Sequence, residues 1–146
     1  MRTRSIIAGA MFVAGVVAAS SSALVYAQSA GQSLGSVRLP AAVRANGQPL
    51  AAGTYTVRLT ADNGTPVVGQ STASARWVEF VQGGQVKGRE LATVVAASDI
   101  ARVGKTKTPP GPGTSRVELL KGADYLRVWC NSGGTHYLVH LAATAK

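Results

Sequence analysis

The strongest constraint on the fold is a two-residue periodicity of apolar side chains in the part of the chain after residue 28. The clearest example is residues 54–59, where Tyr55, Val57 and Leu59 alternate with threonine and arginine. Alternation of this kind is typical of a β-strand with one face on a hydrophobic core and the other in solvent. Helical spacing does not recur in this part of the sequence, and only Ser98–Arg102 suits a single helical turn. The pattern therefore predicts an all-β domain.

Glycine, proline and asparagine divide this part of the chain into short segments. Asn46-Gly47 and Gly83-Gly84 each separate two apolar runs, and both pairs suit a hairpin turn because their residues accept positive φ. The segments expected to be extended are Leu34–Leu39, Ala42–Ala45, Gln48–Leu50, Thr54–Leu59, Pro66–Val68, Arg76–Gln82, Gln85–Val95, Ser115–Leu120, Tyr125–Cys130 and Thr135–Leu141. Their lengths and spacing indicate a small antiparallel β-sandwich of about seven or eight strands, with a small β-barrel as the alternative.

Residues 105–114 (KTKTPPGPGT) interrupt the series of expected strands. Three prolines in this segment lack the N–H group that a sheet interior requires, and two glycines add conformational freedom. We therefore expect a flexible, basic, proline- and glycine-rich loop within a single domain formed by residues 28–146.

The first 27 residues have the organisation of a cleavable signal peptide. Arg2 and Arg4 give a positive start, Ile6–Ala19 is an uncharged apolar run, and three serines precede the small residue Ala27. This order matches the charged, apolar and cleavage regions of secretory signals. An uncleaved membrane anchor over residues 6–27 is the alternative, because that segment can just span a bilayer. We expect cleavage after Ala27, no transmembrane segment in the remaining chain, and a periplasmic or extracellular protein.

Removal of residues 1–27 leaves thirteen basic and six acidic side chains, a formal charge of +7. A basic exported protein meets anionic glycans and other components of the cell envelope. The same charge also maintains solubility without any ligand. The sequence does not favour nucleic acid as a partner, because it contains neither a basic helix nor an interleaved aromatic and basic strand motif.

Cys130 is the single cysteine of the chain, so no intrachain disulfide can form. The residue either packs as a small apolar side chain or pairs with another chain. Its place in an apolar strand favours burial.

Residues 46–57 (NGQPLAAGTYTV) follow the pattern Asn-Gly-x-x-Leu-x-x-Gly-x-Tyr-x-Val. This run resembles one found in secreted bacterial β-sandwich modules of the carboxypeptidase-regulatory-like and transthyretin-like kinds. The resemblance implies a hairpin followed by a strand, and it implies nothing about chemistry.

The last two expected strands can be placed in register. If Ser132-Gly133 is a two-residue turn, Trp129 lies opposite His136. One face of the hairpin is then apolar and carries Leu126, Val128, Cys130, Tyr137, Val139 and Leu141. The other face carries Leu138 together with the aromatic, basic and imidazole side chains of Tyr125, Arg127, Trp129, His136 and His140.

These last five residues are the candidate ligand-binding residues. Tryptophan and tyrosine on a flat sheet can stack on sugar rings, and arginine can bind a carboxylate or phosphate through two hydrogen bonds. The alternative is that this face packs beneath a loop or a neighbouring strand, where cross-strand pairs contribute only about tenths of a kcal/mol each.

Catalytic and metal chemistry are not predicted. His136 and His140 point the same way but lie about 13 Å apart along a strand, which is too far to share one metal ion. Cys130 and His136 project from opposite faces, so they cannot form a nucleophile pair. The carboxylates are scattered singly along the sequence, and no cofactor motif is present.

The sequence thus favours a non-enzymatic, exported binding module for an anionic glycan, a peptide or a cell-surface component. A structural or assembly subunit that pairs through exposed strand edges is the alternative. A hydrolase whose site is assembled from residues distant in sequence is a third hypothesis. The pattern does not fix the oligomeric state.

Overall fold

The computed structural model describes residues 31–63, 68, 74–104 and 108–144. This part of the chain contains nine strands and one short helix. They are β1 (Ser33–Leu39), β2 (Val43–Ala45), β3 (Gln48–Leu50), β4 (Gly53–Asn63), β5 (Ala75–Gln82), β6 (Gln85–Val95), α1 (Ile100–Gly104), β7 (Ser115–Leu119), β8 (Tyr125–Ser132) and β9 (Thr135–Ala143).

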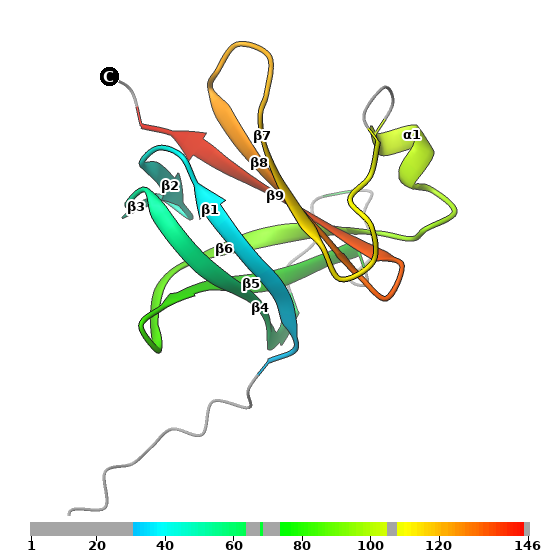
Figure 1. Cartoon of the computed structure of the whole chain (residues 1–146), viewed down its shortest axis with the longest axis horizontal. Coiled ribbons are helices and arrows are strands. Elements are labelled where there is room, and N and C mark those ends of the chain that lie inside the picture. The colour runs from blue at the N-terminus through cyan, green and yellow to red at the C-terminus, as the bar shows by residue number, and fades with distance from the viewer. Residues whose placement is uncertain (1–30, 64–67, 69–73, 105–107, 145–146) are drawn as a thin grey trace, which may run out of the picture.

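All nine strands belong to one antiparallel sheet that is nearly closed into a barrel (Figure 1). Strands β1, β4, β5, β6 and β9 are neighbours in that order, and β8 and β7 continue the sheet beyond β9. The short hairpin β2–β3 is attached to the end of β9. The prediction of a small all-β antiparallel domain is confirmed, and of its two architectures the structure has the barrel-like one.

Three hairpins turn on the residue pairs that accept positive φ. Asn46 and Gly47, between β2 and β3, have φ angles of 46° and 78°. Gly83-Gly84 joins β5 to β6, and Gly133-Gly134 joins β8 to β9. The hairpins predicted at Asn46-Gly47 and Gly83-Gly84 are confirmed, and so is the helical turn predicted around Ser98–Arg102, which is α1.

The hydrophobic core fills the inside of the curled sheet and follows the alternation seen in the sequence. Tyr55, Val57 and Leu59 of β4 face inward and are at most 5% exposed. Cys130 is fully buried in the same core, as its place in an apolar strand predicted. Burial raises the pKa of its thiol, an effect that a hydrogen bond with the Ser115 side chain partly offsets.

Strand β9 has partners on both edges. β8 pairs with it along its whole length, while β6 and then β2 share its other edge. Its inward side chains, Val139 and Leu141 among them, belong to the core, and its outward Leu138 is also buried. This strand, paired on both edges and buried along most of its length, is the element around which the sheet curls.

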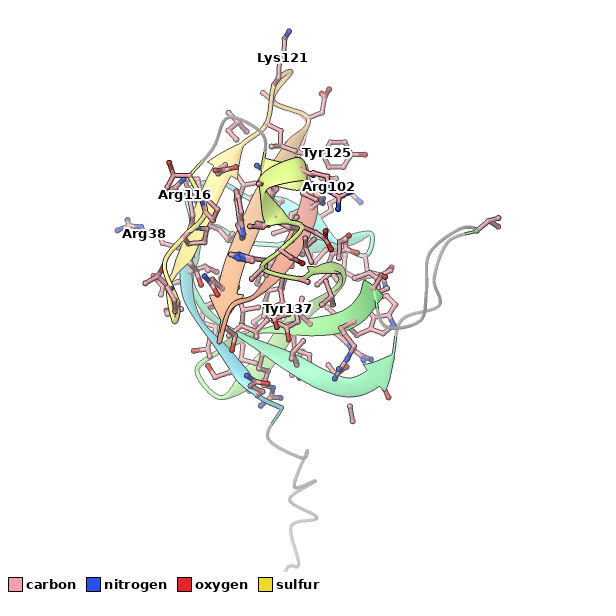
Figure 2. All side chains as sticks on the ribbon, turned by 90° about the vertical axis from the view of Figure 1, so that its right-hand side faces the viewer. Arg38, Arg102, Arg116, Lys121, Tyr125 and Tyr137 are labelled. Atoms are coloured by element: carbon pink, nitrogen blue, oxygen red, sulfur yellow. The ribbon has the colours of Figure 1, made fainter. Side chains whose placement is uncertain are left out.

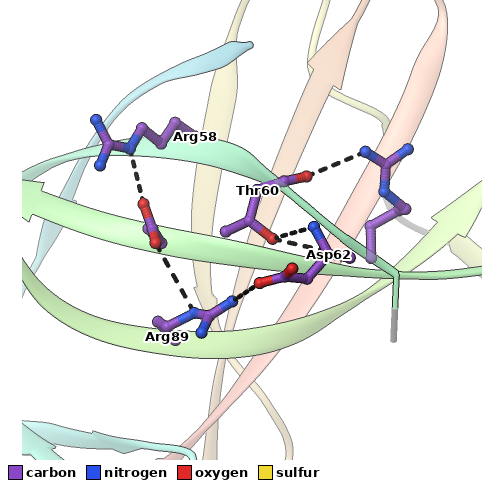
Figure 3. A network of polar contacts seen from close by, with 6 residues as sticks. Arg58, Thr60, Asp62 and Arg89 are labelled. Carbon is purple, nitrogen blue, oxygen red and sulfur yellow. Dashed lines mark hydrogen bonds and ion pairs between the residues drawn. The ribbon is translucent and has the colours of Figure 1, made fainter. Parts of the chain in front are cut away.

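The outer face of β4, β5 and β6 carries a ladder of ion pairs (Figure 3). Glu79 lies between two arginines, with Arg58 Nε at 2.8 Å and Arg89 Nε at 3.8 Å. Arg89 also reaches Asp62 at 2.7 Å, and its guanidinium lies 5.5 Å from the ring centre of Trp77. These contacts pair charges across three strands and hold their register.

The barrel remains open between β1 and β7. The two strands meet near their first residues, where Ser115 Oγ donates to the Leu34 carbonyl oxygen at 3.4 Å. β7 pairs only with β8 among the described strands, and Figure 1 shows β1 and β7 diverging from this contact. We call this opening between β1 and β7 the seam.

Three predicted segments lie wholly or partly outside the described residues. The signal peptide over residues 1–27 is one of them, so it stays a prediction. Of the segment 66–68, the structure describes only Val68, which is an exposed turn residue. Of the loop over residues 105–114, it describes residues 108–114, which form neither a strand nor a helix. In the described part of the chain, no helix has the length and apolar character needed to cross a membrane.

Candidate functional site

The β8–β9 hairpin has a register that differs from the predicted one by two residues. Trp129 lies opposite Leu138 instead of His136, and Arg127 lies opposite His140. The predicted turn at Ser132-Gly133 was wrong, because the turn is formed by Gly133 and Gly134, whose φ angles are 60° and 87°. Since the shift is an even number of residues, every side chain remains on its predicted face.

Trp129 is fully buried although it lies on the outer face of the sheet. Its ring packs with Val95, Ile100 and Leu138 in a small cluster separate from the barrel core. Helix α1 covers the ring so closely that a Cβ atom added to Gly104 would lie 2.8 Å from the Trp129 Cη2 atom. A sugar ring therefore cannot stack on Trp129 while α1 is in place.

His136 is also buried, at 4% exposure, and is hydrogen-bonded to Trp129. Trp129 Nε1 donates to His136 Nδ1 at 3.0 Å, so this nitrogen carries no proton. Burial lowers the pKa of His136. Protonation of His136 would remove the acceptor and place a charge in a buried position, so the neutral imidazole is part of the packing.

Arg127 is held by a neighbouring carboxylate. Its Nε and one terminal nitrogen donate to Glu118 Oε2 at 3.1 and 2.6 Å, and both side chains are largely buried. The guanidinium also lies 5.1 Å from the ring centre of Trp129. These contacts occupy the groups that a ligand carboxylate or phosphate would need.

The remaining two candidates are exposed. Tyr125, at the start of β8, is 49% exposed and lies at the end of the β8–β9 hairpin opposite its turn, near Lys121 (Figure 2). His140 is exposed on β9, and its pKa is lowered by desolvation and by the nearby charge of Arg127, with Glu90 acting in the opposite direction. The five predicted residues thus share one face, but Trp129 lies under α1, His136 is buried beside it, and Arg127 is held in an ion pair.

A pocket of about 470 Å³ opens at the wide end of the seam. We call it the mouth pocket; its lining residues are Ala41, Ala42, Val43, Leu119, Ala123, Asp124, Leu126, Ala143 and Thr144. Leu119 is the last residue of β7 and is 62% exposed, whereas Leu126 belongs to the barrel core. Small and apolar side chains therefore line the pocket from its exposed rim at Leu119 to the core residue Leu126. Asp124 is the single ionisable residue of the lining.

The sequence analysis missed the mouth pocket because its lining comes from four separate segments. The pairing of β7, β8, β9 and β2, together with the curvature of the sheet, brings residues 41–43, 119, 123, 124, 126 and 143–144 together. The available signal was Leu119, a large apolar residue at the end of a strand beside the Lys121-Gly122 turn.

The carboxylates of the described residues are mostly engaged by neighbours. Glu79 and Asp62 belong to the outer ladder, Glu118 binds Arg127, and Asp99 binds Arg102 on α1. Glu90 accepts the backbone N–H of Asn46 at 2.5 Å. Within residues 31–63, 74–104 and 108–144, no group of three or more histidine, cysteine and acidic side chains is placed to bind a metal ion.

No protein-family model matches the chain, and no curated protein or solved structure is significantly similar to it. Function is therefore inferred from the geometry of the chain itself.

The contact between α1 and Trp129 leads to a first prediction. Gly104→Ala places a methyl group against the indole, and such overpacking of a filled site costs about 1–3 kcal/mol. Gly111→Ala is the matched control, because that position is exposed and the added Cβ has no close neighbour. Urea unfolding followed by tryptophan fluorescence measures both variants. Equal unfolding midpoints for Gly104→Ala and the unaltered protein would contradict the close contact.

The buried histidine leads to a prediction about pH. The pKa of His136 lies below the value of 6.5 that it has in the unfolded chain. The unfolded state therefore binds more protons below about pH 6.5, and stability is lost as the pH falls from there toward the folded-state pKa. The loss is limited to about 1.4 kcal/mol per pH unit for a single group.

His136→Gln keeps a neutral acceptor for Trp129 and removes the titration. We expect the free energy of unfolding of this variant to depend less on pH between about pH 7 and pH 5 than that of the unaltered protein. His140→Gln measures the share of the second histidine, whose pKa is also lowered, so the effect of His136→Gln is judged against that variant. The same pH dependence in the unaltered protein and in His136→Gln would show that His136 is not buried as a neutral acceptor.

Proposed function

We propose that the protein is a non-enzymatic binding module, exported through the signal peptide over residues 1–27, that holds an apolar group of its partner in the mouth pocket. The single observation that supports this function is the apolar mouth pocket at the open end of the barrel. Ligand sites in barrel folds are commonly found at such openings, where apolar lining supplies affinity and a few polar groups orient the ligand.

The chemistry of the lining favours an apolar group over a sugar. Ala42, Val43, Leu119 and Leu126 offer methyl groups and no hydrogen-bond donors. Sugars need several polar side chains near an aromatic surface. Of the two candidates for that surface, Trp129 is buried beneath α1, and the exposed Tyr125 does not line the pocket. Among the predicted ligand classes, a peptide with an apolar side chain therefore fits this pocket better than an anionic glycan.

A hydrolase has less support. General acid–base catalysis needs a carboxyl or imidazole group that can reach the substrate. His136 is buried and bonded to Trp129, and Glu118 is committed to Arg127. His140 is exposed but does not line the mouth pocket. Asp124 in the mouth pocket has no second ionisable group beside it in the lining.

Binding of the apolar fluorescent probe N-phenyl-1-naphthylamine tests this function. The probe should bind the purified protein with an increase in fluorescence, because the pocket excludes water from an aromatic ring. Ala42→Phe fills the pocket and should weaken binding by about tenfold or more, a change of about 1.4 kcal/mol. Ala52→Phe is the matched control, an exposed alanine outside the lining, and should bind as the unaltered protein does.

Two results would contradict the proposal. One is the absence of probe binding to a protein that is shown to be folded by its cooperative unfolding transition. The other is equal loss of binding in Ala42→Phe and Ala52→Phe, since this would place the probe elsewhere on the surface.

A further inference from the structure

The sheet ends in three strand edges, and they differ in how well they can accept another strand. The edge of β3 contains Pro49, which has no backbone N–H to offer. The edge of β1 is bent by an irregularity between Ser33 and Gly35, next to the carbonyl that accepts from Ser115. The edge of β7 contains neither a proline nor a bulge. It is the edge best suited to pair with a further strand.

The hydrogen-bond pattern shows which backbone groups of β7 point toward the seam. At its two ends, Thr114 accepts from the Asn131 N–H at 3.0 Å, and Leu120 donates to the Tyr125 carbonyl at 2.9 Å. Because these groups alternate along an antiparallel strand, even-numbered residues bond to β8. The N–H and C=O groups of Val117 and Leu119 consequently point away from β8, into the seam.

The side chains beside the seam are basic on the outside and apolar on the inside. Arg38 of β1 and Arg116 of β7 lie on the same side of the molecule (Figure 2). Arg38 has no carboxylate partner among the described residues. Arg116 donates from Nη1 to the Thr108 carbonyl oxygen at 2.6 Å and lies 3.7 Å from Glu118, which binds Arg127 more closely, and its side chain is 40% exposed. On the inner side, Val117 packs on the core and Leu119 lines the mouth pocket.

We propose that β7 binds an extended segment of a partner protein by strand addition, with apolar and acidic side chains alternating along that segment. The apolar side chains would face inward, and one of them would enter the mouth pocket beside Leu119. The acidic side chains would face outward, between Arg38 and Arg116. The inference rests on the proposed function, because it names the partner whose apolar group the mouth pocket holds.

The experiment measures the binding of three labelled decapeptides to the full chain by fluorescence anisotropy. The first alternates valine and glutamate, the second has lysine in place of glutamate, and the third contains the residues of the first in an order without alternation. We expect only the first peptide to bind well, with about tenfold or larger preference over the lysine peptide and with weaker binding at high salt. Arg38→Gln with Arg116→Gln should remove most of that preference.

Two changes test the backbone pairing separately from charge. Leu119→Pro removes an N–H group that points into the seam, and should weaken peptide binding about tenfold or more, whereas Leu119→Ala retains this group and should weaken it less. The second change is made in the peptide: N-methylation of the backbone N–H groups that would pair with β7 removes these donors and should abolish binding. The protein itself is unaltered in this measurement. This second measurement remains decisive if Leu119→Pro does not fold.

Each other outcome overturns the inference. Equal binding of the glutamate and lysine peptides would contradict the role of the arginines, and full binding of the N-methylated peptide would contradict strand addition. A protein that is already dimeric, and becomes monomeric in Leu119→Pro, would assign the edge to a second copy of this chain. Binding of N-phenyl-1-naphthylamine without binding of any peptide would overturn this inference and leave the proposed function standing.

Discussion

The hydrogen-bonding of β9 along both edges is the constraint on which the rest of the structure depends. One edge is occupied by β8, and the other is divided between β6 and the short β2. β6 and β2 follow one another along the same edge, and the twist between neighbouring strands curls the sheet around β9. This curl places the inward residues in one core and leaves the outward Leu138 to be covered by α1.

The same curl determines what remains open. The sheet brings β1 back toward β7, where Ser115 Oγ and the Leu34 carbonyl form a contact in place of a strand ladder. Beyond this contact the strands separate (Figure 1). The lining of the mouth pocket includes Ala41 and Ala42, which follow β1, and Leu119 at the end of β7, so the pocket lies at the wide end of the seam. Full closure removes the edges of a barrel, whereas an incomplete one leaves edges that need protection or a partner. Pro49 protects β3, and the proposed partner strand completes β7.

Much of the fold could be predicted from local sequence, whereas the candidate site could not. Alternation such as that of Tyr55, Val57 and Leu59 depends on neighbouring residues, and so do the hairpin turns. Even the incorrect turn of the last hairpin left its two faces correctly assigned, since the register moved by two residues. The sequence left the burial of Trp129 as one of two alternatives, and local pattern could not decide between them because the outcome depends on where α1 packs on the sheet. The mouth pocket depends similarly on curvature.

The most direct test of this account is amide hydrogen exchange along β7, resolved by residue with NMR. An open seam predicts alternation, in which the amides of Arg116 and Glu118, which face β8, exchange slowly and those of Val117 and Leu119 exchange much faster. Slow exchange at all four positions would mean that a strand already covers this edge. In that case the barrel is closed, and both the seam and the proposed strand addition would have to be abandoned.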